Sequence, residues 1–145
     1  MDEIRYLSLC GLLGYGYAPQ SLAAALEKDL HFIGVDGGST DPGPYYLGSG
    51  AGFVKPMQVK RDLALVLPEA LKRRIPLIIG SAGGSGARPH VETTLGILRE
   101  IAREKNLRFR TAVIYTDLDA SDLNGKTLYS CGGSPEFDPA VIPLL

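Results

Sequence analysis

Four short apolar runs, each followed within a residue or two by glycine or aspartate, alternate with longer amphipathic stretches along the chain. The runs are Ile4–Cys10, His31–Val35, Ile75–Ile79 and Thr111–Tyr115. Short runs that are rich in β-branched and aromatic residues and bounded by turn residues are typical of buried strands. The pattern therefore predicts four strands.

The stretches between these runs have helical periodicity. Helices are expected over Gln20–Lys28, Gln58–Arg74 and Pro89–Lys105. In the second, the apolar positions fall on one stripe, as expected for a helix that packs on a sheet. Pro68 interrupts that stripe and predicts a kink or two shorter helices.

Strands that alternate with helices predict an α/β fold. Because each run is almost continuously apolar, the sheet is expected to be mostly parallel and covered on both faces. The prediction is a three-layer, doubly wound, Rossmann-like sheet of about four core strands over residues 1–120. Residues 121–145 are expected to form an irregular tail of the same domain or a segment that docks on a partner, with an apolar end at Val141–Leu145.

Composition narrows the class of protein. The chain has 145 residues, of which 45% are hydrophobic and 21% charged, so it can bury a core. A formal net charge of −1 lacks the positive field that nucleic-acid-binding proteins use. No apolar run reaches the roughly 18 residues that span a bilayer, the N-terminus is acidic, and Cys10 and Cys131 do not make a disulfide framework. These features predict a soluble cytoplasmic protein with neither nucleic-acid nor membrane partners.

A parallel sheet brings the carboxyl ends of its strands to one edge, where α/β folds bind ligands. The glycine-rich loop that follows the third run reaches this edge and offers backbone N–H groups and hydroxyls to an anion. The binding candidates there are Ser81, Gly83, Gly84 and Ser85, with His90 beside them to orient an anion or act as a base. The alternatives are a tight turn that serves packing alone, and a surface role for the histidine.

The loop after the second run carries carboxylates and hydroxyls at the same edge. Asp36 and Asp41 are candidate catalytic groups, and the candidate binding groups between them are Gly37, Gly38, Ser39 and Thr40. Such a set suits general acid/base work or a divalent cation. The alternative is a set of Asx turns that hold an irregular segment.

Two further aspartates follow the fourth run. Asp117 is a third candidate catalytic residue, and Asp119 with Asp36 is a candidate ligand of a divalent cation. Solvated acids at a strand end are the alternative reading.

Neither nucleotide-binding sequence pattern is complete. Gly14 and Gly16 follow the first run without the third glycine of the dinucleotide fingerprint, and Gly86 precedes Ala87 and Arg88 rather than the lysine of a phosphate loop. Nucleotide binding therefore remains an alternative that no complete sequence motif supports.

Three segments carry a resemblance to a known family. They are Gly14–Gly16, Val35–Gly48, which contains the string VDGGSTDPGPYYLG, and Ile75–Gly86, which reads IPLIIGSAGGSG. In these segments the chain resembles the N-terminal part of the acyclic terpene utilisation (AtuA-like) family, over about residues 4 to 119. Because members of that family are considerably longer, the resemblance implies an N-terminal α/β portion. It also implies a role in the metabolism of acyl-coenzyme A compounds, without specifying the reaction.

Together these features predict a metabolic enzyme, or a subunit of one, that acts on a small carboxylate or an acyl thioester. Asp36, with Asp41 or Asp117, would supply acid/base chemistry of a lyase or hydratase type. The alternative is a non-catalytic assembly subunit of a split larger enzyme. Association with copies of itself or with a complementary subunit is expected in either case.

Overall fold

The computed structural model describes residues 3–38 and 44–127. Its elements follow one another in the order β1 (Tyr6–Ser8), α1 (Pro19–Ala25), β2 (Phe32–Asp36), α2 (Pro44–Ser49), α3 (Pro56–Arg73), β3 (Leu77–Gly80), the 3-10 helix η1 (Ala82–Gly84), α4 (Arg88–Glu104) and the 3-10 helix η2 (Ala120–Leu123). The alternation of strands and helices confirms the predicted α/β class.

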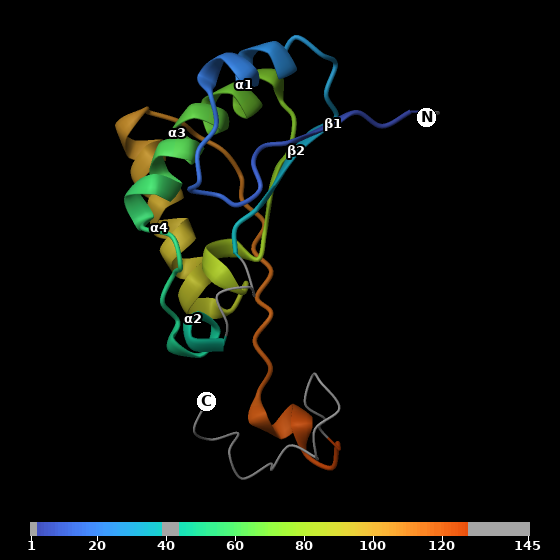
Figure 1. Ribbon diagram of the computed structural model, residues 1–145, viewed down its shortest axis with the longest axis vertical. Coiled ribbons are helices and arrows are strands. Elements are labelled where there is room, and N and C mark those ends of the chain that lie inside the picture. Colours follow the sequence, from blue (N-terminus) through green and yellow to red (C-terminus); the bar gives the residue numbers. More distant parts are fainter. Residues whose placement is uncertain (1–2, 39–43, 128–145) are drawn as a thin grey trace.

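The three strands form one parallel sheet in the order β1-β2-β3. Tyr6 of β1 pairs with Phe32 of β2, and Ile33 of β2 pairs with Leu77 of β3. In Figure 1, helices α1, α3 and α4 lie together on one side of these strands. The described part of the chain therefore has a layer of helices on one face of a three-stranded sheet, and it does not show the predicted three-layer arrangement.

The fourth predicted strand, Thr111–Tyr115, is not a strand in the structure. After α4 the chain turns back past β3 and continues in an extended path toward η2 (Figure 1). Its end is tied to the start of α4 instead of to the sheet: the N–H of Thr116 donates to the carbonyl of Gly86 at 3.2 Å.

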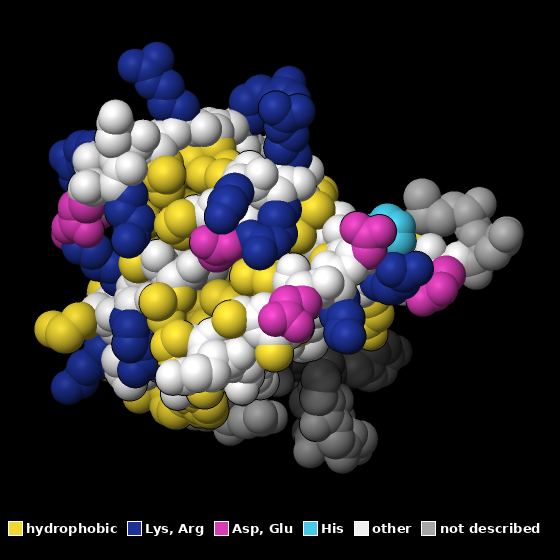
Figure 2. All heavy atoms as spheres, turned by 90° about the horizontal axis from the view of Figure 1, so that it is seen from above, with side chains coloured by type: hydrophobic (Ala, Val, Ile, Leu, Met, Phe, Trp, Pro, Cys, Tyr) yellow, Lys and Arg dark blue, Asp and Glu magenta, His cyan; other side chains and the backbone are white. Residues whose placement is uncertain are grey.

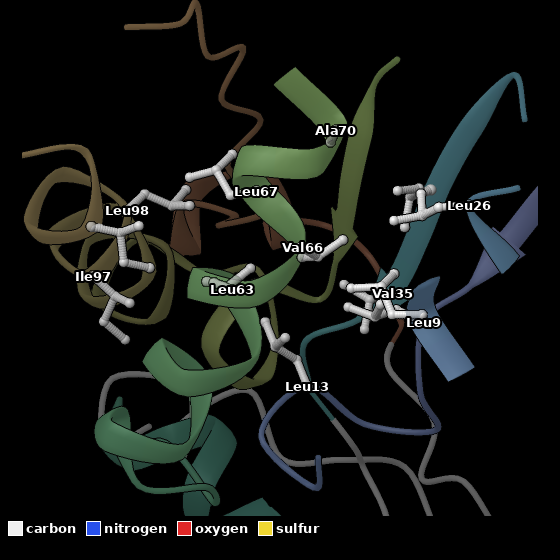
Figure 3. Close-up of a cluster of buried hydrophobic side chains, with 13 residues drawn as sticks. Leu9, Leu13, Leu26, Val35, Leu63, Val66, Leu67, Ala70, Ile97 and Leu98 are labelled. Atoms are coloured by element: carbon white, nitrogen blue, oxygen red, sulfur yellow. The ribbon is translucent and has the colours of Figure 1, made fainter. Parts of the chain in front are cut away.

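Helix α3 is the centre of the core. Pro56 lies in its first turn, and Arg74 ends it in a left-handed conformation with a φ of 58°. It remains one helix through Pro68, where two shorter helices were an expected alternative. Its buried side chains pack on the strands on one side and on α4 on the other (Figure 3); those labelled there are Leu63, Val66, Leu67 and Ala70. The free energy gained by burying apolar side chains on both sides of α3 offsets the loss of the backbone hydrogen bond that Pro68 removes.

The strands alternate as a sheet with one covered face requires. Ile33 and Val35 of β2 point into the core, whereas Tyr6 and Ile78 remain 62% and 53% exposed on the other face. The rings of Tyr6 and Phe32 stack on this outer face with their centroids 5.2 Å apart. The outer face of the sheet thus carries apolar side chains that no described element covers.

Charge is dispersed on the face that Figure 2 shows. Lys and Arg side chains are spread over this face, alone or in small groups among hydrophobic and acidic ones, instead of forming one basic patch. In the ranges 3–38 and 44–127, no helix combines the length and the apolar character that a membrane crossing requires.

Candidate functional site

The carboxyl ends of β2 and β3 meet at one edge of the sheet. Asp36, the last residue of β2, is paired with Gly80, the last residue of β3, and the N–H of Gly37 donates to the carbonyl of Gly80 at 2.7 Å. The loops that follow both strands, the second of which begins with Ser81, therefore leave the sheet side by side. The Asp36 carboxylate is exposed, and its Oδ1 accepts the N–H of Gly38 at 3.0 Å.

Close packing accounts for several glycines of these loops. A Cβ on Gly38 would lie 2.0 Å from the carbonyl oxygen of Gly84, and a Cβ on Gly83 would lie 2.3 Å from the carbonyl oxygen of His90. Gly83 also has a φ of +77°, which L side chains rarely adopt. The two loops are thus pressed on each other and on the first turn of α4. This contact supports the packing role that was the alternative to anion binding.

His90 is buried within this packing and is 1% exposed. Its Nδ1 lies 2.8 Å from the Oγ of Ser85, and its Nε2 lies 3.1 Å from the carbonyl oxygen of Ala51. The Oγ of Ser85 also accepts the N–H of Ala87 at 3.2 Å. The histidine is therefore an interior residue that joins three segments of the chain, instead of the surface residue that was the alternative.

The start of α4 already holds a carboxylate from the same chain. The N–H of Arg88 lies 2.9 Å from both carboxylate oxygens of Asp117, and the guanidinium of Arg88 stacks over the ring of Tyr115 at 4.1 Å. The Tyr115 hydroxyl donates to Glu92, and this hydrogen bond raises the pKa of Tyr115. Asp117, predicted to be catalytic, thus acts as the cap of a helix N-terminus in this structure.

Asp119, predicted as a metal ligand, has a similar local role. Its side chain accepts a hydrogen bond from the backbone at the start of η2, and Asp122 completes the capping box by accepting the N–H of Asp119 at 3.1 Å. Within residues 3–38 and 44–127, no group of three or more His, Cys, Asp or Glu side chains is placed to hold a metal ion. Ser39, Thr40 and Asp41 lie outside the described residues, as does the apolar C-terminal end.

Asp62 of α3 was not among the predicted site residues, yet it is buried and organises the loop after β1. Its Oδ2 accepts the N–H groups of Gly14 at 2.8 Å and Gly16 at 3.0 Å, and its Oδ1 accepts the guanidinium Nε of Arg61 at 2.9 Å. The Tyr17 hydroxyl donates to the Asp62 carbonyl at 2.6 Å. An aspartate on the apolar stripe of the predicted helix, three residues after Val59, is the signal that identifies it in the sequence.

This arrangement bears on nucleotide binding. In dinucleotide-binding folds, the N–H groups of the loop after the first strand receive the phosphates. Here the Gly14 and Gly16 N–H groups face the carboxylate of Asp62, whose negative charge opposes phosphate. Burial, followed by the charge of Asp62, raises the pKa of Cys10 and of Tyr17 on the same loop.

Two cavities flank the glycine-rich loop. The larger, of about 670 Å³, lies between β3, α3, α4 and the segment that runs back past β3. Its walls include Leu67, Leu77, Leu95 and Phe109, and its lining also includes the polar residues Ser81, Ser85 and Thr116. The smaller, of about 170 Å³, is lined by Gly37, Gly38, Gly83, Gly84 and, from neighbouring segments, Phe53, Lys55 and Thr93. Asp36 lines neither cavity, whereas each predicted binding residue of the glycine-rich loop lines one of them.

No family model matches the chain, and no curated protein or solved structure matches it either. The resemblance to the AtuA-like family therefore stays a prediction from the three sequence segments quoted above.

Proposed function

We propose that the chain is a metabolic enzyme, or the substrate-binding subunit of one, that acts on a small carboxylate or an acyl thioester. The observation that carries the proposal is the larger cavity: aliphatic and aromatic side chains form most of its lining, and the hydroxyls of Ser81, Ser85 and Thr116 lie where β3 gives way to α4. A ligand that fits this arrangement has a hydrocarbon part and one polar end.

The size of the cavity agrees with a small ligand. Ligand sites commonly measure roughly 300–1,000 Å³ and are mostly apolar with a few polar groups that fix orientation. At about 670 Å³ the larger cavity lies in this range. In the proposed complex the hydrocarbon lies between Leu67 and Leu95, and the carboxylate or acyl carbonyl lies at the hydroxyls of Ser81 and Ser85.

Asp36, which was predicted to be catalytic, has a smaller role in this proposal than the serines of the glycine-rich loop. Its carboxylate is exposed at the same edge of the sheet but lines neither cavity. Acid/base chemistry of a lyase or hydratase type would need the substrate to extend from the cavity toward Asp36. The serine hydroxyls are better placed than Asp36 to contact a ligand in the cavity itself.

Titration calorimetry with butanoate, hexanoate, octanoate and decanoate tests the binding part. Each buried CH₂ contributes about 0.8 kcal/mol, or about fourfold in affinity, until the cavity is full. The Val113→Trp substitution places a large side chain in the cavity lining and is expected to abolish the dependence on chain length. Leu118→Trp is the matched control, because Leu118 is exposed on the same segment and is not part of the lining.

The proposal fails if the wild-type chain binds none of these acids. It fails equally if affinity does not change with chain length, or if Val113→Trp binds as the wild type does.

One observation favours the alternative of a non-catalytic assembly subunit of a larger split enzyme. Parallel sheets are almost always covered on both faces, yet the side chains of Tyr6 and Ile78 stand exposed on the outer face of this sheet. In this alternative the complementary chain of the split enzyme would cover that face. Sedimentation of the chain alone and with that second chain, for wild type and for Tyr6→Lys, distinguishes the two functions, because the acid-binding test does not depend on Tyr6.

A further inference from the structure

We propose that Ser85 is the nucleophile of an acyl-transfer reaction, with His90 as its general base. The inference rests on the proposed function, since it takes the larger cavity to hold the acyl group. Ser85 was predicted only to bind an anion, and His90 to orient an anion or act as a base; the inference assigns the pair a covalent step. The juxtaposition that carries it is the 2.8 Å contact between the Ser85 Oγ and the His90 Nδ1 beside that cavity.

The partners of the imidazole fix the direction of this hydrogen bond. The carbonyl oxygen of Ala51 can only accept, so the His90 Nε2 that lies 3.1 Å from it carries the ring proton in the neutral imidazole. The Nδ1 atom then presents a lone pair, and the Ser85 hydroxyl donates to it. This is the orientation in which a histidine takes the proton of a nucleophile.

The serine oxygen has one further contact, from the N–H of Ala87 at 3.2 Å. Because that N–H donates, it leaves the Ser85 proton directed at His90. A backbone donor on the same oxygen also favours the negative charge that develops there as the proton leaves. Nucleophile, base and the carbonyl that orients the base are therefore all in contact before any substrate binds.

The packing around the ring holds this geometry. His90 is 1% exposed, and a Cβ on Gly84 would lie 3.1 Å from two of its ring atoms. The Thr94 hydroxyl donates to the His90 carbonyl at 3.1 Å from within α4. The base is thus fixed by its own helix on one side and by the close approach of Gly84 on the other, as a catalytic group requires.

Access to the serine comes from the larger cavity. Ser85 is partly exposed and lines the larger cavity together with Ser81 and Thr116. The Thr116 hydroxyl donates to the Ser85 carbonyl at 3.1 Å, which fixes the backbone at the nucleophile. A thioester whose hydrocarbon part fills the cavity would bring its carbonyl carbon to this hydroxyl.

The step balances without an oxidant, a reductant or a metal. The Ser85 Oγ forms a bond to the acyl carbon while its proton passes to the His90 Nδ1. The carbon–sulfur bond then breaks, and the thiol leaves with that proton, so that the acyl group remains as an ester of Ser85. Water that transfers a proton to the same nitrogen attacks the ester, releases the carboxylic acid and restores the serine hydroxyl.

The test uses an alkyl fluorophosphonate, which phosphonylates an activated serine and releases fluoride, with intact-mass measurement and peptide mapping. We expect one added phosphonyl group per folded chain, on Ser85. Its rate should exceed that of the same serine in urea by at least about a hundredfold, the smallest usual contribution of a general base. Equal rates in the folded and unfolded wild-type chain overturn the proposal, and this comparison needs no variant.

Variants assign the roles. Ser85→Ala should lose the label, and Ser81→Ala, which changes a hydroxyl on the same loop, should keep it. His90→Gln, whose amide nitrogen can still donate to the Ala51 carbonyl, should retain a folded chain by circular dichroism and react about a hundredfold more slowly. A folded His90→Gln variant that reacts as the wild type does would remove the histidine from the mechanism.

The outcomes separate this inference from the proposed function. Octanoate binding without labelling of Ser85 leaves the cavity as an acyl site and refutes the nucleophile. Labelling of Ser85 without binding of any acid of the series refutes the cavity as the acyl site while the activated serine stands.

Discussion

The carboxylate of Asp62 accepts the backbone N–H of Gly14 at 2.8 Å, across 48 positions of sequence. The contact joins α3 to the loop after β1, which also places Leu13 in the core, where it is 1% exposed. A buried carboxylate is stabilising only when its oxygens are fully hydrogen-bonded. Asp62 therefore fixes the first loop at the edge of the sheet where the candidate site lies.

Replacing Asp62 is expected to be among the most damaging single changes to this fold. Asp62→Ala leaves the N–H groups of Gly14 and Gly16 without their acceptor, and it should lower the free energy of unfolding by about 3–5 kcal/mol. Asp62→Asn keeps one acceptor and should cost about 1–3 kcal/mol. Urea titration followed by circular dichroism measures both, with Asp29→Asn as the exposed control, expected within about 0.5 kcal/mol of wild type. An Asp62→Asn chain as stable as the wild type would contradict a structural role for the charge.

Tyr17 provides a test that depends on pH. Burial and the neighbouring Asp62 raise its pKa in the folded chain, whereas an unfolded tyrosine ionises near about pH 10. Above that pH the folded state binds more protons than the unfolded state, so the free energy of unfolding contributed by Tyr17 is present below about pH 10 and is lost as pH rises further.

The Tyr17→Phe variant should show this loss less steeply than the wild type between about pH 9.5 and 11. At pH 7 it should be less stable by about 1 kcal/mol, because the hydrogen bond to the Asp62 carbonyl is gone. Tyr15→Phe, an exposed phenol on the same loop, is the control. Parallel stability curves for Tyr17→Phe and wild type over this range would refute the assignment.

Much of the fold was predictable because the strongest signals are local. The apolar runs that became β1, β2 and β3 are short and bounded by glycine, and the stripe on α3 has a clear helical period. Thr111–Tyr115 has the same local character and still does not pair with the sheet. Its end is held by Gly86 and Arg88 at the start of α4, and such long-range competition leaves no trace in a short window of sequence.

The site was predictable only to the extent that topology determines it. Parallel strands place Asp36 and Ser81 at one edge, as expected. The burial of His90 and its contact with the Ala51 carbonyl depend on the return of a segment 39 residues away, which no local pattern encodes. The place of Asp62 on the apolar stripe marks it as a buried acid, but its partners Gly14 and Gly16 lie on another element and could not be predicted from that stripe.

The cap of α4 should contribute measurably to stability. Asp117→Ala removes a carboxylate from the positive end of the helix and leaves the Arg88 N–H without its partner. The expected loss is about 1 kcal/mol, as for other helix caps. Thermal unfolding with Asp29→Ala as the exposed control measures it. A loss no larger than that of the control would mean that the cap does not hold in solution.

Replacing glycine by alanine is expected to change stability in opposite directions at two positions, Gly38 and Gly96. An alanine at Gly38 would place its Cβ 2.0 Å from the carbonyl oxygen of Gly84, and because that neighbour is backbone, the loop that carries Ser85 has to move. Overpacking of this kind costs about 1–3 kcal/mol. Gly96 is exposed within α4, and a Cβ added there would meet nothing within 4 Å beyond the helix's own backbone. Gly96→Ala should therefore stabilise the chain by about 0.5–1 kcal/mol through helix propensity. Thermal and urea unfolding of the two variants should therefore shift in opposite directions from wild type, and only Gly38→Ala should slow the fluorophosphonate reaction of Ser85. If Gly38→Ala is at least as stable as the wild type, the close contact between the two loops at the edge of the sheet does not exist in solution, and the rigid setting of the Ser85–His90 pair is lost with it.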